Sequence, residues 1–194
     1  MTYKLKEMRL FFAHWPDLAR RFQKAEEWLL MFDYDGTLAP IVLRPSHARL
    51  SDAIRRKLRR LALRDKCAVG VLSGRSLSDL RQRVGIHHLI YVGNHGLDIE
   101  SDGWGFAHHQ SPEAGRELHW DKGSAVNWLR RVMRRRTLVF YIGDGPTDEN
   151  AFRALAKVGV TLRVGRKKDS AAAYYVQRQA DVSRVLDQFI AIGS

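Results

Sequence analysis

The sequence WLLMFDYDGTL occupies residues 28–38 and determines the fold that we predict for the chain. Its first five residues are apolar, and two carboxylates spaced two residues apart, Asp33 and Asp35, follow them directly. A short apolar run that becomes polar only at its end is typical of a strand buried on both faces of a parallel sheet. Open α/β sheets bind ligands beyond the carboxyl ends of their strands, so we predict a ligand site at these two acids.

The two carboxylates also predict a metal ion. Because side chains alternate along a strand, Asp33 and Asp35 are expected to point the same way. Two carboxylates that lie so close together repel each other unless a cation neutralises them. Oxygen ligands suit a hard ion such as Mg²⁺. Gly36 allows backbone N–H groups to approach an oxyanion, and Thr37 adds a hydroxyl donor. The alternative is a strand end whose acids only cap the following turn.

Length and composition indicate an ordinary globular domain. The chain has 194 residues, of which 45% are hydrophobic and 28% charged, so we expect a single domain over residues 1–194. It has no apolar run of transmembrane length, and residues 1–9 lack the apolar core of a signal peptide. The single cysteine, Cys67, excludes an intrachain disulfide and favours a reducing, cytoplasmic setting.

The net charge of +12 is the unusual feature of the composition. Its cations gather in residues 55–60, 130–131, 134–136 and 166–168. The first two groups lie between apolar positions of predicted helices, as is typical of solvated helix faces. The alternative is an anionic partner such as nucleic acid, an acidic glycan or a membrane surface. Because no nucleic-acid-binding motif accompanies the charge, we do not expect nucleic acid.

Buried strands and amphipathic helices alternate along the chain, which predicts a Rossmann-like, three-layer α/β fold with a parallel sheet. The predicted strands cover residues 28–33, 67–72, 89–92, 137–142 and 160–164. The predicted helices cover residues 10–26, 51–63, 76–85 and 123–135, a stretch that begins at Thr147, and residues 181–192. Pro16 interrupts the pattern of the first helix and is expected to strain or split it; a membrane-surface helix is the alternative there.

The residues that follow the strands suit phosphoryl transfer. Asp33 can attack phosphorus as a nucleophile, and Asp35 can protonate the leaving oxygen and then deprotonate the attacking water. Ser73 can donate its hydroxyl to a phosphoryl oxygen, and Lys122 can neutralise the nucleophile and the transition state. Each has a simpler interpretation: Ser73 as a turn residue, for example, and Lys122 as a surface lysine.

Two further acids complete the predicted metal site. Asp144 and Asp148 lie in the loop before a helix and are expected to join Asp33 and Asp35 around Mg²⁺, Asp144 directly and Asp148 through water or Lys122. Alone, Asp144 is compatible with an Asx turn, and Asp148 with an acid in the second turn of a helix. The joint occurrence of these residues at predicted strand and helix boundaries favours the catalytic interpretation.

These stretches resemble the four motifs of haloacid-dehalogenase-like phosphatases. The motifs are DYDGT at 33–37, SGR at 73–75, KG at 122–123 and GDGPTDE at 143–149. More narrowly, FDYDGTLAPI at 32–41, GNHG at 93–96, WDKG at 120–123 and DENAFRAL at 148–155 are similar to trehalose-6-phosphate phosphatases. The resemblance implies a Rossmann-like core, dependence on Mg²⁺, and phosphomonoester hydrolysis through an aspartyl-phosphate on Asp33.

The chain departs from that family at its cap and at one acid. The family inserts an α/β cap before the lysine motif, whereas only residues 97–121 fill the gap here, and we expect a short hairpin as a reduced cap insert. Gly145 stands where the family usually has a second Asp; Asp144 and Asp148 remain, so we expect the metal site to be kept.

A reduced cap predicts an open site for a sugar phosphate or a larger phosphorylated glycan. Substrate contacts are then expected from the surroundings of the nucleophile, namely Gly36, Thr37, Gly74, Arg75, Asn94 and His95. Arg75 has an alternative partner in Asp79, one helical turn later. A small sugar phosphate covered by the hairpin or by a second copy of the chain is one alternative. Another is a basic binding or regulatory module, for an anionic partner, on a vestigial phosphatase core.

Overall fold

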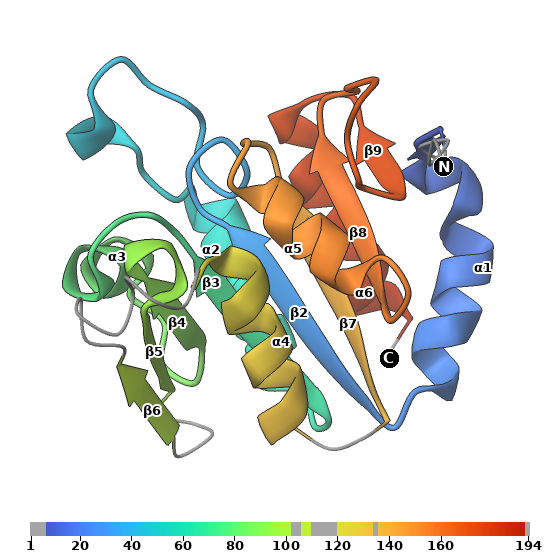
Figure 1. The fold of residues 1–194 in the computed structure, drawn as a ribbon, viewed down its shortest axis with the longest axis horizontal. Coiled ribbons are helices and arrows are strands. Elements are labelled where there is room, and N and C mark those ends of the chain that lie inside the picture. Colours follow the sequence, from blue (N-terminus) through green and yellow to red (C-terminus); the bar gives the residue numbers. More distant parts are fainter. Residues whose placement is uncertain (1–6, 102–105, 110–119, 134–135, 193–194) are drawn as a thin grey trace.

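The computed structural model describes residues 7–101, 106–109, 120–133 and 136–192, whose strands form one sheet (Figure 1). Within these residues the strand order is β1-β9-β8-β7-β2-β3-β4-β5-β6. The strands are β1 (Arg9–Leu10), β2 (Glu27–Asp33), β3 (Cys67–Leu72), β4 (Ile90–Gly93), β5 (Asp98–Ser101), β6 (Phe106–His109), β7 (Thr137–Gly143), β8 (Gly159–Val164) and β9 (Tyr174–Val176).

The apolar run of β2 lies at the centre of the sheet. It pairs in parallel with β3 on one side and with β7 on the other, and all seven of its residues are buried. Leu30 and Phe32 contribute to the core on one face of the sheet, and Leu29 and Met31 to the core on the other face. This burial on both faces is what the unbroken apolar pattern predicts.

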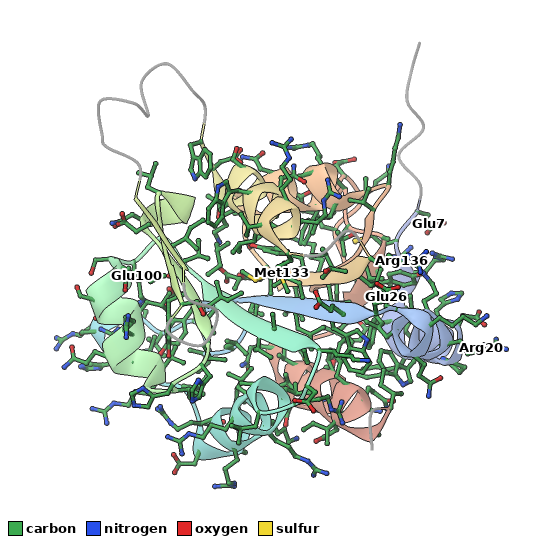
Figure 2. The ribbon with its side chains drawn as sticks, turned by 90° about the horizontal axis from the view of Figure 1, so that it is seen from below. Glu7, Arg20, Glu26, Glu100, Met133 and Arg136 are labelled. Carbon is green, nitrogen blue, oxygen red and sulfur yellow. The ribbon has the colours of Figure 1, made fainter. Side chains whose placement is uncertain are left out.

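Helices cover both faces of the sheet, so the predicted three-layer α/β fold is confirmed. Figure 2 shows α4 and α5 above the sheet and α2 and α6 below it, with α1 at one end. One core is formed with α1 (Phe11–Lys24), α2 (Asp52–Ala62), α3 (Leu77–Val84) and α6 (Val182–Ala191), and the other with α4 (Lys122–Val132) and α5 (Asp148–Leu155). The described residues also form short 3₁₀ turns, among them η1 (Pro45–His47), η2 (Asn94–Gly96) and η4 (Gln179–Asp181).

The helix boundaries follow local capping chemistry. The hydroxyl of Ser51 accepts a hydrogen bond from the backbone N–H of Ile54 at the start of α2, and Ser76 caps α3 through Asp79 N–H in the same way. Gly85 ends α3 in the left-handed conformation, with φ of 57°. These three boundaries agree with those predicted from the sequence.

The first helix differs from its prediction in two respects. Leu10 belongs to β1, so α1 begins one residue later, and α1 then continues through Pro16 without a break. Its apolar face is buried against the domain, where Trp15 and Phe22 pack edge-on against Phe189 of α6. This packing compensates for the hydrogen bond that Pro16 cannot donate. No helix in the described part of the chain has the length and apolar composition to cross a membrane.

The short strands at one edge of the sheet were not predicted. β1 pairs in parallel with β9, with Arg9 opposite Tyr174 and Leu10 opposite Tyr175. The Arg9 guanidinium lies 4.5 Å from the centroid of the Tyr174 ring and donates a hydrogen bond to its hydroxyl. Strands of two and three residues are too short to show a periodic pattern, so only the tertiary fold reveals them.

The expected hairpin extends the other edge of the sheet. β5 is antiparallel to β4, and β6 is antiparallel to β5, so the sheet is mostly rather than entirely parallel. Residues 102–105 and 110–119 of the insert lie outside the described residues. The helix predicted to reach residue 135 ends at Val132, and residues 134–135 also lie outside them.

Several cations of α2 contact the ends of neighbouring helices. Arg55 donates to the carbonyl of Val84, and Arg59 donates to that of Gly85 at 3.3 Å, both at the C-terminus of α3. Arg64, just after α2, donates at 3.0 Å to the carbonyl of Phe189 near the end of α6. Cations stabilise the negative end of a helix dipole. Part of the basic surface of α2 therefore joins helices to one another.

Cys67 is buried in strand β3. Burial raises the pKa of its thiol to about 12, because the thiolate would lose its hydration. At pH 8 about 1 in 10⁴ folded molecules then carries the thiolate. We predict that Ellman's reagent modifies the folded chain at least about 100-fold more slowly than the chain unfolded in guanidinium chloride. Equal rates at pH 8 would contradict the burial of β3.

Candidate active site

Most of the predicted site residues line one cavity at the carboxyl ends of the central strands. The cavity has a volume of about 450 Å³. It is lined by Asp33, Asp35, Ser73, Gly74, Arg75, His95, Lys122, Asp144 and Asp148, together with Ile41, Val42, Ala48, Gly145 and Thr147. The strand order places the ends of β7, β2 and β3 side by side, which brings together residues far apart in the sequence.

A buried lysine joins two of the acids. Lys122 Nζ lies 2.6 Å from Asp33 Oδ1 and 2.8 Å from Asp148 Oδ1, and all three side chains are buried. The start of α4 positions Lys122, because the Asp121 side chain caps that helix by accepting from Ser124 N–H at 2.9 Å. Two buried carboxylates thus share one ammonium group.

Burial and charge shift the pKa values of this group. Burial raises the pKa of Asp33 well above its usual value, and the nearby Lys122 only partly opposes this shift. Burial also disfavours the ammonium form of Lys122, but the charges of Asp33 and Asp148 outweigh that effect and raise its pKa. The lysine therefore stays charged at neutral pH, where it favours the ionised form of Asp33.

Asp148 accepts hydrogen bonds from four donors. One carboxylate oxygen accepts from Lys122 and, at 2.6 Å, from the Tyr141 hydroxyl. The other accepts from the backbone N–H groups of Asp144 and Gly145, at 3.1 and 2.9 Å. Asp148 thus fixes both the lysine and the loop that carries Asp144. The sequence analysis did not predict this role for the Tyr141 hydroxyl. Any aromatic ring fits the buried strand β7, so the pattern does not indicate that a hydroxyl is needed there.

Three carboxylates are close enough to hold one cation. Asp33, Asp144 and Asp148 each offer a ligand oxygen, and these oxygens lie within 4.8 Å of one another. Burial and the charge of Asp148 raise the pKa of Asp144, with Lys122 and Arg163 opposing the shift. Such crowding of carboxylates around one lysine leaves negative charge that a divalent ion can neutralise, and an all-oxygen donor set suits Mg²⁺. Because Asp148 is already saturated with hydrogen bonds, Asp33 and Asp144 are the better direct ligands.

The side chain of Asp35 lies outside this acidic group. Its carboxylate forms an ion pair with Arg75, whose Nη2 lies 2.6 Å from Oδ1 and whose Nε lies 2.9 Å from Oδ2. The hydroxyl of Ser73 donates to the same carboxylate at 3.3 Å. Arg75 also pairs with Asp79 at 3.0 Å, the alternative partner considered from the sequence, whereas its pairing with Asp35 was not predicted. The predicted phosphate-binding residues thus surround Asp35.

The loop after β2 explains the need for glycine at position 36. Gly36 has φ of 81°, and a Cβ there would lie 2.1 Å from Asp144 Oδ2. Thr37 is fully buried, and its hydroxyl has no hydrogen-bond partner among the described residues. The carbonyl of Thr37 accepts from Gln179 Nε2 at 2.9 Å. Gly36 thus borders the acidic group, whereas Thr37 lies behind the cavity.

The loop after β4 contributes His95 but not the Asn94 side chain. The backbone N–H of His95 donates to the Ser73 carbonyl at 3.1 Å, which ties this loop to the one after β3. The imidazole lies so close to Gly74 that a Cβ there would be 2.4 Å from its Cε1 atom. The Asn94 side chain instead donates to the carboxylate of Asp98. Of the two residues, His95 lines the cavity.

Arg163 and Glu149 hold the Asp144 loop from its buried side, and the sequence analysis missed both. Arg163 Nη1 lies 3.1 Å from Glu149 Oε1, and both side chains are almost completely buried. The guanidinium also donates to the backbone carbonyls of Asp144 and Gly145. The only sequence signal was an arginine inside the otherwise apolar strand of residues 160–164, which marks a buried charge in need of a partner.

Comparisons with known proteins find relatives in sequence and in fold. The trehalose-phosphatase family model matches residues 31–120. A crystal structure of Aspergillus fumigatus trehalose-6-phosphate phosphatase superposes with a TM-score of 0.78, covering 96% of this chain and 99% of that chain at 23% identity. The trehalose-phosphate phosphatase of Mycobacterium avium is 44% identical over 203 residues, which cover 65% of this chain and 51% of that protein.

The chain resembles trehalose-phosphate phosphatases in part of its sequence and shares the fold of a trehalose-6-phosphate phosphatase. It spans about half of the Mycobacterium avium relative and 18% of an uncharacterized glycosyl hydrolase of Mycobacterium tuberculosis, to which it is 28% identical over 242 residues. The alignment to the Mycobacterium avium protein is 203 residues long, which exceeds the 194 residues of this chain, although it includes only 65% of this chain. That relative therefore has residues with no counterpart in this chain.

We predict that Arg163→Ala destabilises the fold by about 3–5 kcal/mol, because it leaves Glu149 buried without its cation. The measurement is the free energy of unfolding from urea titrations followed by circular dichroism. Arg153→Ala is the matched control, since Arg153 is exposed and contacts Asn150 of its own helix. The control should change stability by less than about 0.5 kcal/mol. Similar effects of both substitutions would show that the buried pair does not support the loop.

Proposed function

We propose that the chain is a cytoplasmic, Mg²⁺-dependent phosphomonoester hydrolase that acts through an aspartyl-phosphate on Asp33. The observation that carries the proposal is the position of Asp33, at the end of the central strand, 2.6 Å from the buried Lys122 and beside Asp144. A nucleophile needs an environment that keeps it ionised and neutralises the charge it meets on phosphorus. Lys122 supplies the positive charge that this requires, whereas Asp144 and Asp148 by themselves raise the pKa of Asp33 and would favour its ionised form only through a cation that they hold.

The side chains lining the cavity can perform both half-reactions. Asp33 attacks phosphorus, the bond to the ester oxygen breaks, and Asp35 gives its proton to the leaving alcohol. Asp35, now ionised, then takes a proton from a water molecule that attacks the phosphorus of the aspartyl-phosphate. The P–O bond to Asp33 breaks, inorganic phosphate leaves, and both carboxyl groups return to their starting states.

Positioning falls to the remaining residues. Ser73 donates to Asp35 and accepts from the backbone N–H of Arg75, and it is proposed to donate to a phosphoryl oxygen when substrate binds. Lys122 stabilises the negative charge that develops in the transition state. Arg75 and His95 line the same cavity and are proposed to contact the substrate, and the backbone of Gly36 and Gly74 leaves room for it. Thr37 and Asn94 are proposed to shape these loops rather than touch the phosphoryl group.

Asp33 and Asp144 would hold Mg²⁺ directly, with Asp148 in support. Asp35 would serve through its backbone, because its carboxylate is engaged by Arg75. When bound, the ion supplies positive charge that counters repulsion between the nucleophile and the phosphoryl oxygens.

The substrate is proposed to be a sugar phosphate or a larger phosphorylated glycan bound in an open site. The names of the relatives support a phosphorylated sugar, and trehalose 6-phosphate is the first compound to test. The short insert of residues 97–121 and the unmatched residues of the Mycobacterium avium relative support a reduced cap. A reduced cap leaves recognition to the cavity itself, so we expect weak discrimination among small sugar phosphates.

We predict that hydrolysis of 4-nitrophenyl phosphate stops in chelator and returns with Mg²⁺, while Ca²⁺ inhibits. Ca²⁺ accepts a larger and looser set of ligands, so it can draw both oxygens of Asp33 away from in-line attack. The measurement is the initial rate at buffered free metal concentrations. Asp144→Asn should raise the Mg²⁺ concentration needed for half-maximal rate by about tenfold or more. Full activity after chelation and dialysis would contradict the metal site.

We predict that Asp33→Asn lowers kcat by about 10³-fold or more, because no carboxylate remains to attack phosphorus. The same substitution at Asp17, an exposed acid of α1 that pairs with Arg20, is the matched control and should leave kcat unchanged. Circular dichroism checks that both variants fold. Activity of Asp33→Asn near that of the control would refute the aspartyl-phosphate mechanism.

A further inference from the structure

The cavity around Asp33 has one polar and one apolar wall. Ser73, Arg75 and His95 form the polar wall. Ile41, Val42 and Ala48, all from the loop between β2 and α2, form the apolar wall, and this loop extends beyond the end of β2 (Figure 1). Ile41 is 77% exposed, which is unusual for a large apolar side chain at the edge of a polar site. The proposed phosphoryl chemistry does not use it.

The apolar wall begins next to the proposed general acid. Asp35 and Ala39 form an isolated β-bridge, and the backbone N–H of Gly36 donates to the Ala39 carbonyl at 2.8 Å. Ile41 is only two residues beyond Ala39. Because Asp35 must protonate the leaving oxygen, that oxygen has to lie beside it during the reaction. Ile41 and Val42 follow this bridge in the chain and line the same cavity, so they are candidates to contact the part of the substrate attached to that oxygen.

We propose that Ile41 and Val42 bind the leaving group, so that preferred substrates are phosphomonoesters with an apolar surface next to the ester oxygen. Such surfaces include an alkyl or aryl group and the C–H face of a glycoside. The inference rests on the proposed function, because it takes Asp35 as the proton donor. It adds a criterion of specificity that the phosphate-binding residues do not provide, since those residues act alike on every phosphomonoester.

The neighbouring Leu43 provides an internal control. It is fully exposed, but it does not line the cavity, so it offers the same kind of apolar surface outside the site. A loop that served to bind another protein would use Leu43 at least as much as Ile41. A loop that contacts the leaving group would use Ile41 and Val42 and be insensitive to Leu43.

The test is binding of methyl-, butyl- and hexylphosphonate to the Mg²⁺-loaded chain, measured by isothermal titration calorimetry. These compounds share one headgroup and differ only in the apolar tail. Burial of a methylene group favours binding by about fourfold, so in this open cavity we expect Kd to fall by about two- to fourfold for each of the first few methylenes. Ile41→Ser and Val42→Ser should flatten this dependence and leave methylphosphonate binding unchanged, whereas Leu43→Ser should keep it.

Three results would overturn the inference. The first is a Kd independent of tail length while methylphosphonate still binds, which would leave the proposed phosphoryl site intact. The second is a loss of the dependence in Leu43→Ser equal to that in Ile41→Ser, accompanied by self-association in sedimentation velocity, which would indicate that a second copy covers the loop. The third is absence of binding by methylphosphonate and inorganic phosphate alike, which would refute the proposed function together with the inference.

Discussion

The site depends on one buried ammonium group placed between two buried carboxylates. Lys122 Nζ contacts both Asp33 and Asp148, and all three side chains are buried. Each charge is therefore shielded from solvent and depends on its partner for stabilisation. Removal of one partner from a buried ion pair leaves an uncompensated buried charge. The loss of folding stability is then far larger than when an exposed ion pair is broken. The start of α4, the end of β2 and the start of α5 are therefore held in register by electrostatics as well as by apolar packing.

A second layer of buried polar groups extends this constraint to the Asp144 loop. Asp148 binds the backbone of the loop from one side, and Arg163, paired with Glu149, binds it from the other. The loop consequently presents the Asp144 carboxylate toward Asp33 with little freedom to move away. The proposed metal site would require such support, because carboxylates that repel each other separate unless their backbone is fixed.

The mouth of the cavity is built differently from its floor. The floor consists of charged groups fixed by hydrogen bonds, whereas the apolar wall is a loop whose largest side chain, Ile41, is exposed. This division fits the proposed function, in which the phosphoryl group is recognised strictly and its substituent loosely. Strands β5 and β6 belong to the insert and extend the sheet beyond β4.

The sequence by itself determined the central strand, the alternation of strands and helices, and most residues of the cavity. Those features depend on local patterns: an apolar run before Asp33, serine caps at positions 51 and 76, and acids just after strands. The tertiary structure decided the rest. The pairing of β1 with β9 depends on contacts between distant segments. Likewise, only the fold shows that the Asp35 carboxylate turns to Arg75, that Tyr141 supports Asp148, and that Arg163 holds the Asp144 loop. A buried polar side chain takes its role from whichever partner the fold brings within hydrogen-bond distance, and that partner cannot be read from sequence spacing.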